Sequence, residues 1–105
     1  MIFTAKTVTG AEAMELGIVN DVVQQNGEGN AALMHAFLVA QSIAENGPIG
    51  VKMAKVAIDK GIGVSSLKEA LLVEESCYAK VIPTTDRLEG LLAFQEKRKP
   101  KYEGK

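Results

Sequence analysis

The sequence of 105 residues has little of several features that mark particular classes of protein. It has one cysteine, Cys77, which excludes an internal disulfide framework and fits a reducing compartment. The 12 basic and 13 acidic residues leave a net charge of −1, so no excess of either sign indicates nucleic-acid binding or an acidic tail. No run of 18 apolar residues predicts a transmembrane helix, and the first residues do not predict a signal or transit peptide.

Tryptophan is absent and aromatic residues make up only 5% of the chain, whereas hydrophobic residues as a whole make up 47%. Ala, Val, Leu and Ile therefore supply most of the apolar surface. This composition favours helices that pack through aliphatic faces, in a chain of the length of one domain. We therefore predict a mainly α-helical fold.

Local signals place the helices. A capping box of Thr9 and Glu12 opens a short helix that ends before Gly17. Apolar residues at helical spacing and the breaks between them predict four more: residues 30–45, residues 48–60, a helix capped by Ser65 or Ser66 that ends at Pro83, and a last helix capped by Thr84 or Thr85. Residues 2–8 predict a short strand or a frayed end, and residues 18–23 a short extended segment.

Few residues of the sequence indicate a catalytic or metal-binding role. His35 is the only histidine and has no carboxylate three or four positions away on its helix, so a structural or surface role is favoured over a general base or a metal ligand. Glu74 and Glu75 are adjacent and do not converge on one substrate atom, so we expect a polar helix edge with a salt bridge to Lys68 or Lys80. Cys77 lies in an apolar helical run and is expected to be buried.

The best candidate for an anion site is the basic tail. Residues 97–105 hold five basic residues and one Glu, and Pro100 and Gly104 predict that they are not helical. Cations after a helix also stabilise its C-terminus, which accounts for part of this pattern. Phe94 precedes Lys97 by one helical turn, and we place both on one helix face, where a ring beside an ammonium suits a purine with an attached phosphate.

Two stretches carry a family resemblance. Residues 46–61 (NGPIGVKMAKVAIDKG) and residues 85–100 (TDRLEGLLAFQEKRKP) resemble the C-terminal signature of the enoyl-CoA hydratase (crotonase) superfamily. Residues 77–90 are most similar to its methylglutaconyl-CoA hydratase branch, the AU-binding enoyl-CoA hydratases. The resemblance covers nearly the whole chain and identifies it as the C-terminal third of such a protein. It implies that residues 1–29 end the crotonase core and that residues 30–105 form the helical oligomerisation region.

The resemblance also implies a function. The family hydrates 2-enoyl-CoA thioesters such as methylglutaconyl-CoA, with catalytic glutamates and an oxyanion hole that lie upstream of this segment, so no catalytic residue is expected here. Phe94 and Lys97 match the residues that reach coenzyme A across the subunit boundary, the ring against adenine and the ammonium against phosphate. No other cofactor and no metal are implied. A homo-oligomer, a trimer or hexamer, and a mitochondrial location in leucine degradation follow from the same resemblance.

Three functional hypotheses remain open. The first is the helical, coenzyme A-covering part of a hydratase that is inactive by itself. The second is a non-catalytic oligomerisation module that modulates a full-length paralogue, because apolar helix faces without cover tend to find partners. The third is RNA binding by the basic tail. The net charge near zero and the scarcity of aromatic residues make it the weakest of the three.

Overall fold

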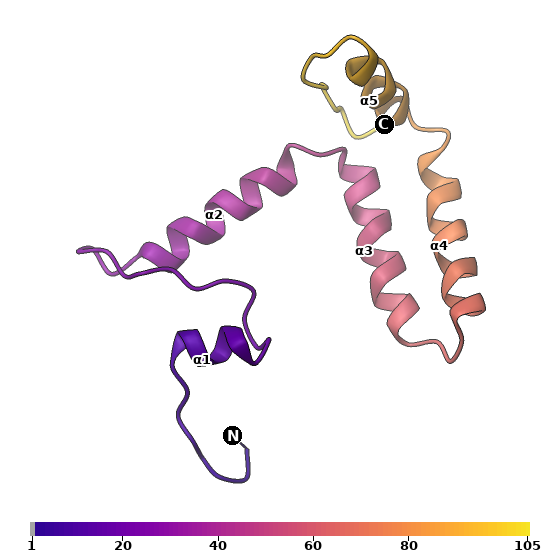
Figure 1. Ribbon diagram of the computed structural model, residues 1–105. Helices are drawn as coiled ribbons and strands as arrows, with labels where there is room; N and C mark the ends of the chain where they lie inside the picture. Colours follow the sequence, from indigo (N-terminus) through magenta and orange to yellow (C-terminus); the bar gives the residue numbers. More distant parts are fainter. Residues whose placement is uncertain (1) are drawn as a thin grey trace. The chain divides into compact units, whose positions relative to one another are not determined.

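The computed structural model describes residues 2–105, and its regular secondary structure there consists of five α-helices (Figure 1). The chain divides into two compact units, Met1–Ala40 and Gln41–Lys105. The mainly α-helical prediction is confirmed. Of the two alternatives predicted for residues 2–8, the strand is wrong, because residues 2–5 form turns and residues 6–9 have no regular structure. Residues 18–23 likewise form no strand. A strand needs a partner to satisfy its backbone N–H and C=O groups, and no second strand is found in the described part of the chain.

Helix α1 (Gly10–Glu15) begins and ends as its sequence predicts. The hydroxyl of Thr9 accepts from the N–H of Glu12 at 3.2 Å, and the Glu12 carboxylate accepts from the N–H of Thr9 at 2.8 Å. At the other end Gly17 has a φ of +68° and its N–H donates to Met14. The N–H of Ile18 donates to Ala13 at 2.8 Å, so α1 ends in a Schellman motif with glycine at the left-handed position.

Helix α2 (Ala31–Ala44) follows a polar loop and spans the boundary between the two units. The side chain of Gln25 accepts from the N–H of Ala31 at 2.9 Å, which satisfies one of the free N–H groups at the start of the helix. None of its residues is buried, although its apolar positions recur at helical spacing as predicted. The large apolar side chains of α2 are therefore exposed: Leu33, Met34, Phe37, Leu38, Val39 and Ile43.

In the second unit, α3 (Pro48–Ile62) and α4 (Leu67–Val81) pack side by side, joined by a short turn (Figure 1). Pro48 opens α3 at a position where its missing N–H costs nothing. Ser66 caps α4 by accepting from the N–H of Glu69. The Glu69 carboxylate accepts from Ser65, not from Ser66, so Ser66 and Glu69 form only half of a capping box.

Helix α5 (Thr85–Gln95) follows Pro83 and is capped by Thr84, whose hydroxyl accepts from the N–H of Arg87 at 3.2 Å. After α5 the chain turns back and runs along the helix, so that Lys105 lies beside the first turn of α5 (Figure 1). The set of buried residues in the described part of the chain is small. It consists of three small apolar or thiol side chains and two polar ones: Ala13, Cys77, Ala93, Thr84 and Asp86.

Candidate functional site

The end of α5 holds both residues predicted to bind the nucleotide, but not in the arrangement expected. Phe94 lies in the last turn of the helix and is 85% exposed. Lys97 lies beyond the helix, which ends at Gln95, so the two do not share a helix face and that prediction is wrong. The reason is the backbone of Lys97, which has a φ of +54° and leaves the helical path. Its N–H donates to the carbonyl of Phe94 at 3.2 Å, so the two residues remain joined through the main chain.

The turn at Lys97 is a second Schellman motif. The N–H of Arg98 donates to Ala93 at 3.0 Å, just as that of Ile18 donates to Ala13 at the end of α1. The left-handed position is occupied by Gly17 in the first motif and by Lys97 in the second. A residue with a Cβ is less stable in this conformation by about 1 kcal/mol, and glycine is the usual choice. The turn itself therefore does not require a lysine.

Arg98, the next residue, is held by two carboxylates. Its Nη1 and Nη2 donate to the two oxygens of Glu89 at 2.6 and 2.9 Å, and its Nε donates to Glu96 at 2.6 Å. Glu89 also accepts from the backbone N–H of Lys101 at 2.7 Å. These contacts, the guanidinium first and the N–H second, lower the pKa of Glu89 to about 2, and the same carboxylates raise the pKa of Arg98.

The rest of the tail is fixed along α5 by the helix's acidic side chains. The buried carboxylate of Asp86 accepts from the N–H groups of Glu103 at 2.7 Å and Gly104 at 2.8 Å. The carbonyl of Lys105 accepts from the N–H of Asp86 and from the hydroxyl of Thr85. The non-helical tail is therefore confirmed, but it is an ordered segment, and only part of its charge is open to a ligand.

The tail also packs against two glycines. The side chain of Tyr102 lies against Gly47 and Gly90: its ring is 3.5 Å from the position of a Cβ on Gly47, and its hydroxyl is 3.1 Å from that of a Cβ on Gly90. This contact joins the tail to the start of α3 and the middle of α5. Of the five basic residues, Arg98 and Lys105 are in ion pairs, whereas Lys97, Lys99 and Lys101 have no ion pair with any residue in 2–105. Lys97 is the one of these three whose backbone N–H binds the carbonyl of Phe94, the residue with the exposed ring.

An apolar groove of about 670 Å³ runs between α3 and α4. Small residues such as Gly50, Ala54 and Ala57 line its α3 side and allow the approach of α4. Glu74 is the one carboxylate among the groove's lining residues. The remaining lining residues are mostly large and apolar: Met53, Ile58, Ile62, Leu67, Leu71, Tyr78 and Val81. Ile62 is 81% and Leu67 76% exposed, so the end of the groove nearest the turn is open.

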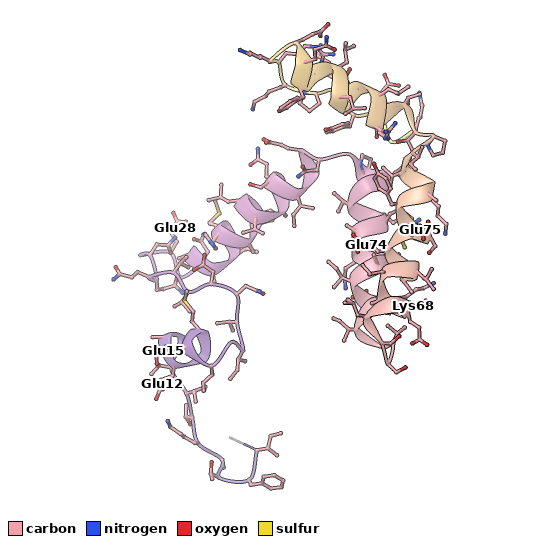
Figure 2. The ribbon with its side chains drawn as sticks, turned by 45° about the vertical axis from the view of Figure 1, so that its right-hand side comes forward. Glu12, Glu15, Glu28, Lys68, Glu74 and Glu75 are labelled. Atoms are coloured by element: carbon pink, nitrogen blue, oxygen red, sulfur yellow. The ribbon has the colours of Figure 1, made fainter. Side chains whose placement is uncertain are left out.

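Glu74 and Glu75, the adjacent carboxylates considered for chemistry, both lie on α4. Figure 2 shows Lys68 near the start of α4 and Glu74 and Glu75 further along it, and no ion pair joins either glutamate to Lys68 or Lys80 among the residues that the structure describes. The salt bridge predicted there is wrong, and both glutamates stand on α4 without a converging partner.

His35 is paired with a carboxylate and Cys77 is buried, so the surroundings of both favour structural roles. Nε2 of His35 lies 2.6 Å from the Asp21 carboxylate, a partner in the preceding loop that helical spacing did not reveal. The N–H of Val22 and, second, His35 lower the pKa of Asp21. Cys77 is buried in α4, as predicted. Within residues 2–105 no three His, Cys, Asp or Glu side chains are placed to share a metal ion, and no helix has the length and apolarity needed to cross a membrane.

Comparison with known proteins gives the class. The sequence pattern of the family described as "Enoyl-CoA hydratase/isomerase" matches residues 1–105. The chain therefore belongs to the enoyl-CoA hydratase/isomerase family, and the resemblance drawn from residues 46–61 and 85–100 is confirmed.

Individual relatives define the match more closely. The chain is 51% identical over its full length to enoyl-CoA hydratase domain-containing protein 2, mitochondrial, of Mus musculus, and covers 35% of that protein. It is 47% identical to methylglutaconyl-CoA hydratase, mitochondrial, of Homo sapiens, over 99% of the chain and 30% of that protein. A crystal structure of enoyl-CoA hydratase from Bacillus anthracis superimposes with a TM-score of 0.90 and 44% identity, over 99% of this chain and 38% of that one. The chain thus spans about a third of the length of these relatives and corresponds to their C-terminal part.

Proposed function

We propose that this chain is the coenzyme A-covering and oligomer-forming part of an enoyl-CoA hydratase, with Phe94 and Lys97 as its contacts to the nucleotide. The observation that carries the proposal is Lys97 in a left-handed conformation where glycine is more stable. A long cation at such a position, three residues after an exposed aromatic residue, fits a ligand with a π-face next to a phosphate.

The energetics support this pairing. Lys97 and Phe94 are both exposed, so neither contributes to the core of its own chain. A charge-assisted hydrogen bond from an ammonium to phosphate contributes about 1.5–3 kcal/mol. This exceeds the roughly 1 kcal/mol that the left-handed lysine costs the folded chain. The ligand contact therefore outweighs the conformational cost whenever coenzyme A is bound.

Oligomerisation is the second part of the proposal. None of the residues of α2 is buried, and the groove between α3 and α4 is apolar and open at one end. Apolar surface of this extent is covered in a stable protein. Neighbouring subunits of a homo-oligomer, a trimer or hexamer, would cover it and would place the end of α5 at a neighbour's acyl-CoA.

The same proposal leaves catalysis to the rest of a longer enzyme. Glu74 and Glu75 do not converge, and His35 is paired with Asp21. We expect the 105 residues alone not to hydrate crotonyl-CoA. The identities of 51% and 47% to the two mitochondrial relatives do not separate them, so methylglutaconyl-CoA as the substrate and the mitochondrion as the location are also proposals.

A hybrid enzyme tests the nucleotide contact. In it, this chain replaces the corresponding third of the Bacillus anthracis hydratase, which it matches with a TM-score of 0.90. Lys97→Ala is expected to weaken coenzyme A binding, measured by calorimetry, roughly 10- to 100-fold. Lys99→Ala, an exposed tail lysine two residues away, is the matched control and should change binding less than twofold. Equal affinities of the Lys97→Ala and unsubstituted hybrids would refute the contact.

The alternative is a non-catalytic module that joins a full-length paralogue, and the same exposed apolar faces favour it. Sedimentation of this chain alone and mixed with a full-length hydratase distinguishes the two. Mixed oligomers with altered hydratase activity would support the module. Self-association alone, together with activity in the hybrid, would support the enzyme.

A further inference from the structure

The three residues of the turn after α5 differ in what their side chains do. Glu96 and Arg98 are joined to each other, and Arg98 is joined to Glu89 by two hydrogen bonds. Lys97 stands between them without an ion pair or side-chain hydrogen bond to any residue in 2–105. Of these three side chains, that of Lys97 alone has no partner among residues 2–105, and it lies between two side chains that are held in place.

Glu89 is the centre of this arrangement. It lies on α5 and its side chain is 22% exposed, against 49% for Glu96. Its two oxygens bind Arg98 in a fork, and one of them also binds the N–H of Lys101. One carboxylate, carried by the helix that precedes Lys97, therefore fixes the chain at two points after it, one residue and four residues further on.

We propose that Glu89 is a positioning residue, which holds Lys97 in its left-handed conformation through Arg98 and the N–H of Lys101 and so presents the ammonium to the phosphate of coenzyme A. This rests on the proposed function of Lys97. The turn is strained by its lysine, and strain persists only where surrounding contacts hold it. Arg98, by chemistry the stronger phosphate ligand, is less suited to that role here, because its Nε, Nη1 and Nη2 already donate to carboxylates.

The first claim of the proposal, that Glu89 holds the backbone of Lys97 in its left-handed conformation, is tested on this chain alone. The backbone coupling constant and the Cα chemical shift of Lys97 report its φ in solution. Glu89→Gln is expected to shift both away from the left-handed values of the parent chain. Glu96→Gln, which removes the other carboxylate on Arg98, is the matched control and should leave them unchanged. Unchanged values in Glu89→Gln would overturn the proposal, as would an equal change in both variants.

The second claim, that Glu89 supports coenzyme A binding through Lys97, is tested in the hybrid enzyme by a double-mutant cycle. Glu89→Gln is expected to raise the Kd for coenzyme A and the KM for crotonyl-CoA roughly fivefold with kcat unchanged. In a Lys97→Ala background the same substitution should have no further effect, because Glu89 acts only through Lys97. Equilibrium binding gives this result even without turnover.

The outcomes separate the two proposals. If Lys97→Ala leaves the affinity unchanged, the proposed nucleotide contact fails. If Lys97→Ala weakens binding but Glu89→Gln has no effect, or has the same effect in both backgrounds, the contact stands and the positioning role of Glu89 fails. A loss of kcat in Glu89→Gln also contradicts a role confined to binding.

Discussion

The carboxylate of Asp86, in the first turn of α5, accepts a hydrogen bond from the backbone N–H of Gly104 at 2.8 Å, across 18 positions of sequence. A second N–H, that of Glu103, binds the other oxygen at 2.7 Å. Asp86 is 6% exposed, so both bonds are shielded from water. This carboxylate is the main anchor of the tail at the start of α5, as Glu89 is further along the helix.

The two hydrogen bonds of Asp86 predict that Asp86→Asn, a nearly isosteric substitution, lowers the free energy of unfolding substantially. Asp86→Asn replaces one accepting oxygen with an amide that donates, and leaves one backbone N–H facing it. The free energy of unfolding in urea is expected to fall by about 2 kcal/mol. Glu75→Gln, on the exposed surface of α4, is the control and should change it by less than about 0.5 kcal/mol. An unchanged midpoint for Asp86→Asn would show that the tail does not depend on this contact.

The pKa of Glu89 predicts how the tail responds to acid. Its folded value is about 2 and its ordinary value is 4.5, so the ionised carboxylate stabilises the tail above pH 4.5. That contribution is lost as the pH falls from about 4.5 through about 2. The Tyr102 ring resonances should report release of the tail over this range. In Glu89→Gln the transition at Tyr102 should flatten, and a transition that persists unaltered would assign it to another group.

Lysine at the left-handed position predicts opposing effects on stability and binding. Lys97→Gly relieves the strain at φ +54° and should raise the free energy of unfolding by about 0.5–1 kcal/mol. The same substitution removes the ammonium and should weaken coenzyme A binding in the hybrid as much as Lys97→Ala does. Gly17→Ala at the end of α1 is the mirror experiment and should destabilise by a similar amount. A Lys97→Gly chain no more stable than its parent would contradict the strained turn.

The position of Tyr102 predicts that Gly90→Ala does not stabilise the chain, although glycine to alanine within a helix usually does. Glycine to alanine inside a helix stabilises by about 1 kcal/mol. At Gly90 the new methyl would lie 3.1 Å from the Tyr102 hydroxyl, so the ring must move and the gain is lost. In a Tyr102→Ala background the full gain should return. Thermal unfolding of the four chains of this cycle measures both effects, and equal gains in the two backgrounds would place Tyr102 away from Gly90.

The helices could be predicted because their signals are local. Thr9 with Glu12, Pro48, Ser66 and Thr84 all mark the helix starts that the structure shows. The strand over residues 2–8 was wrong because a strand is defined by a partner, which no local pattern supplies.

The geometry of the candidate site could be predicted only in part, because it too depends on partners that local sequence does not reveal. Phe94 and Lys97 remain predicted nucleotide contacts, but the helix face that they were predicted to share is wrong, since the helix stops before Lys97. The contacts of Asp86 and Glu89 with the tail join residues up to 18 positions apart and go to backbone N–H groups, which leave no trace in side-chain spacing. The one available signal was the pair of acids three positions apart on α5, opposite a tail rich in basic residues.

Asp86 and Glu89 bind the main chain of the tail at positions 101, 103 and 104. Substitutions along the tail therefore differ in whether they loosen it. The side chains at positions 101 and 103 are exposed and free to differ among homologues without loosening the tail. Proline is excluded at 101, 103 and 104, since it lacks the N–H that each of these bonds uses. An aromatic ring at 102 and glycine at 104, with its φ of +77°, are the side-chain constraints. A family alignment of this region should therefore show two invariant columns among variable neighbours, and the variable ones should still lack proline.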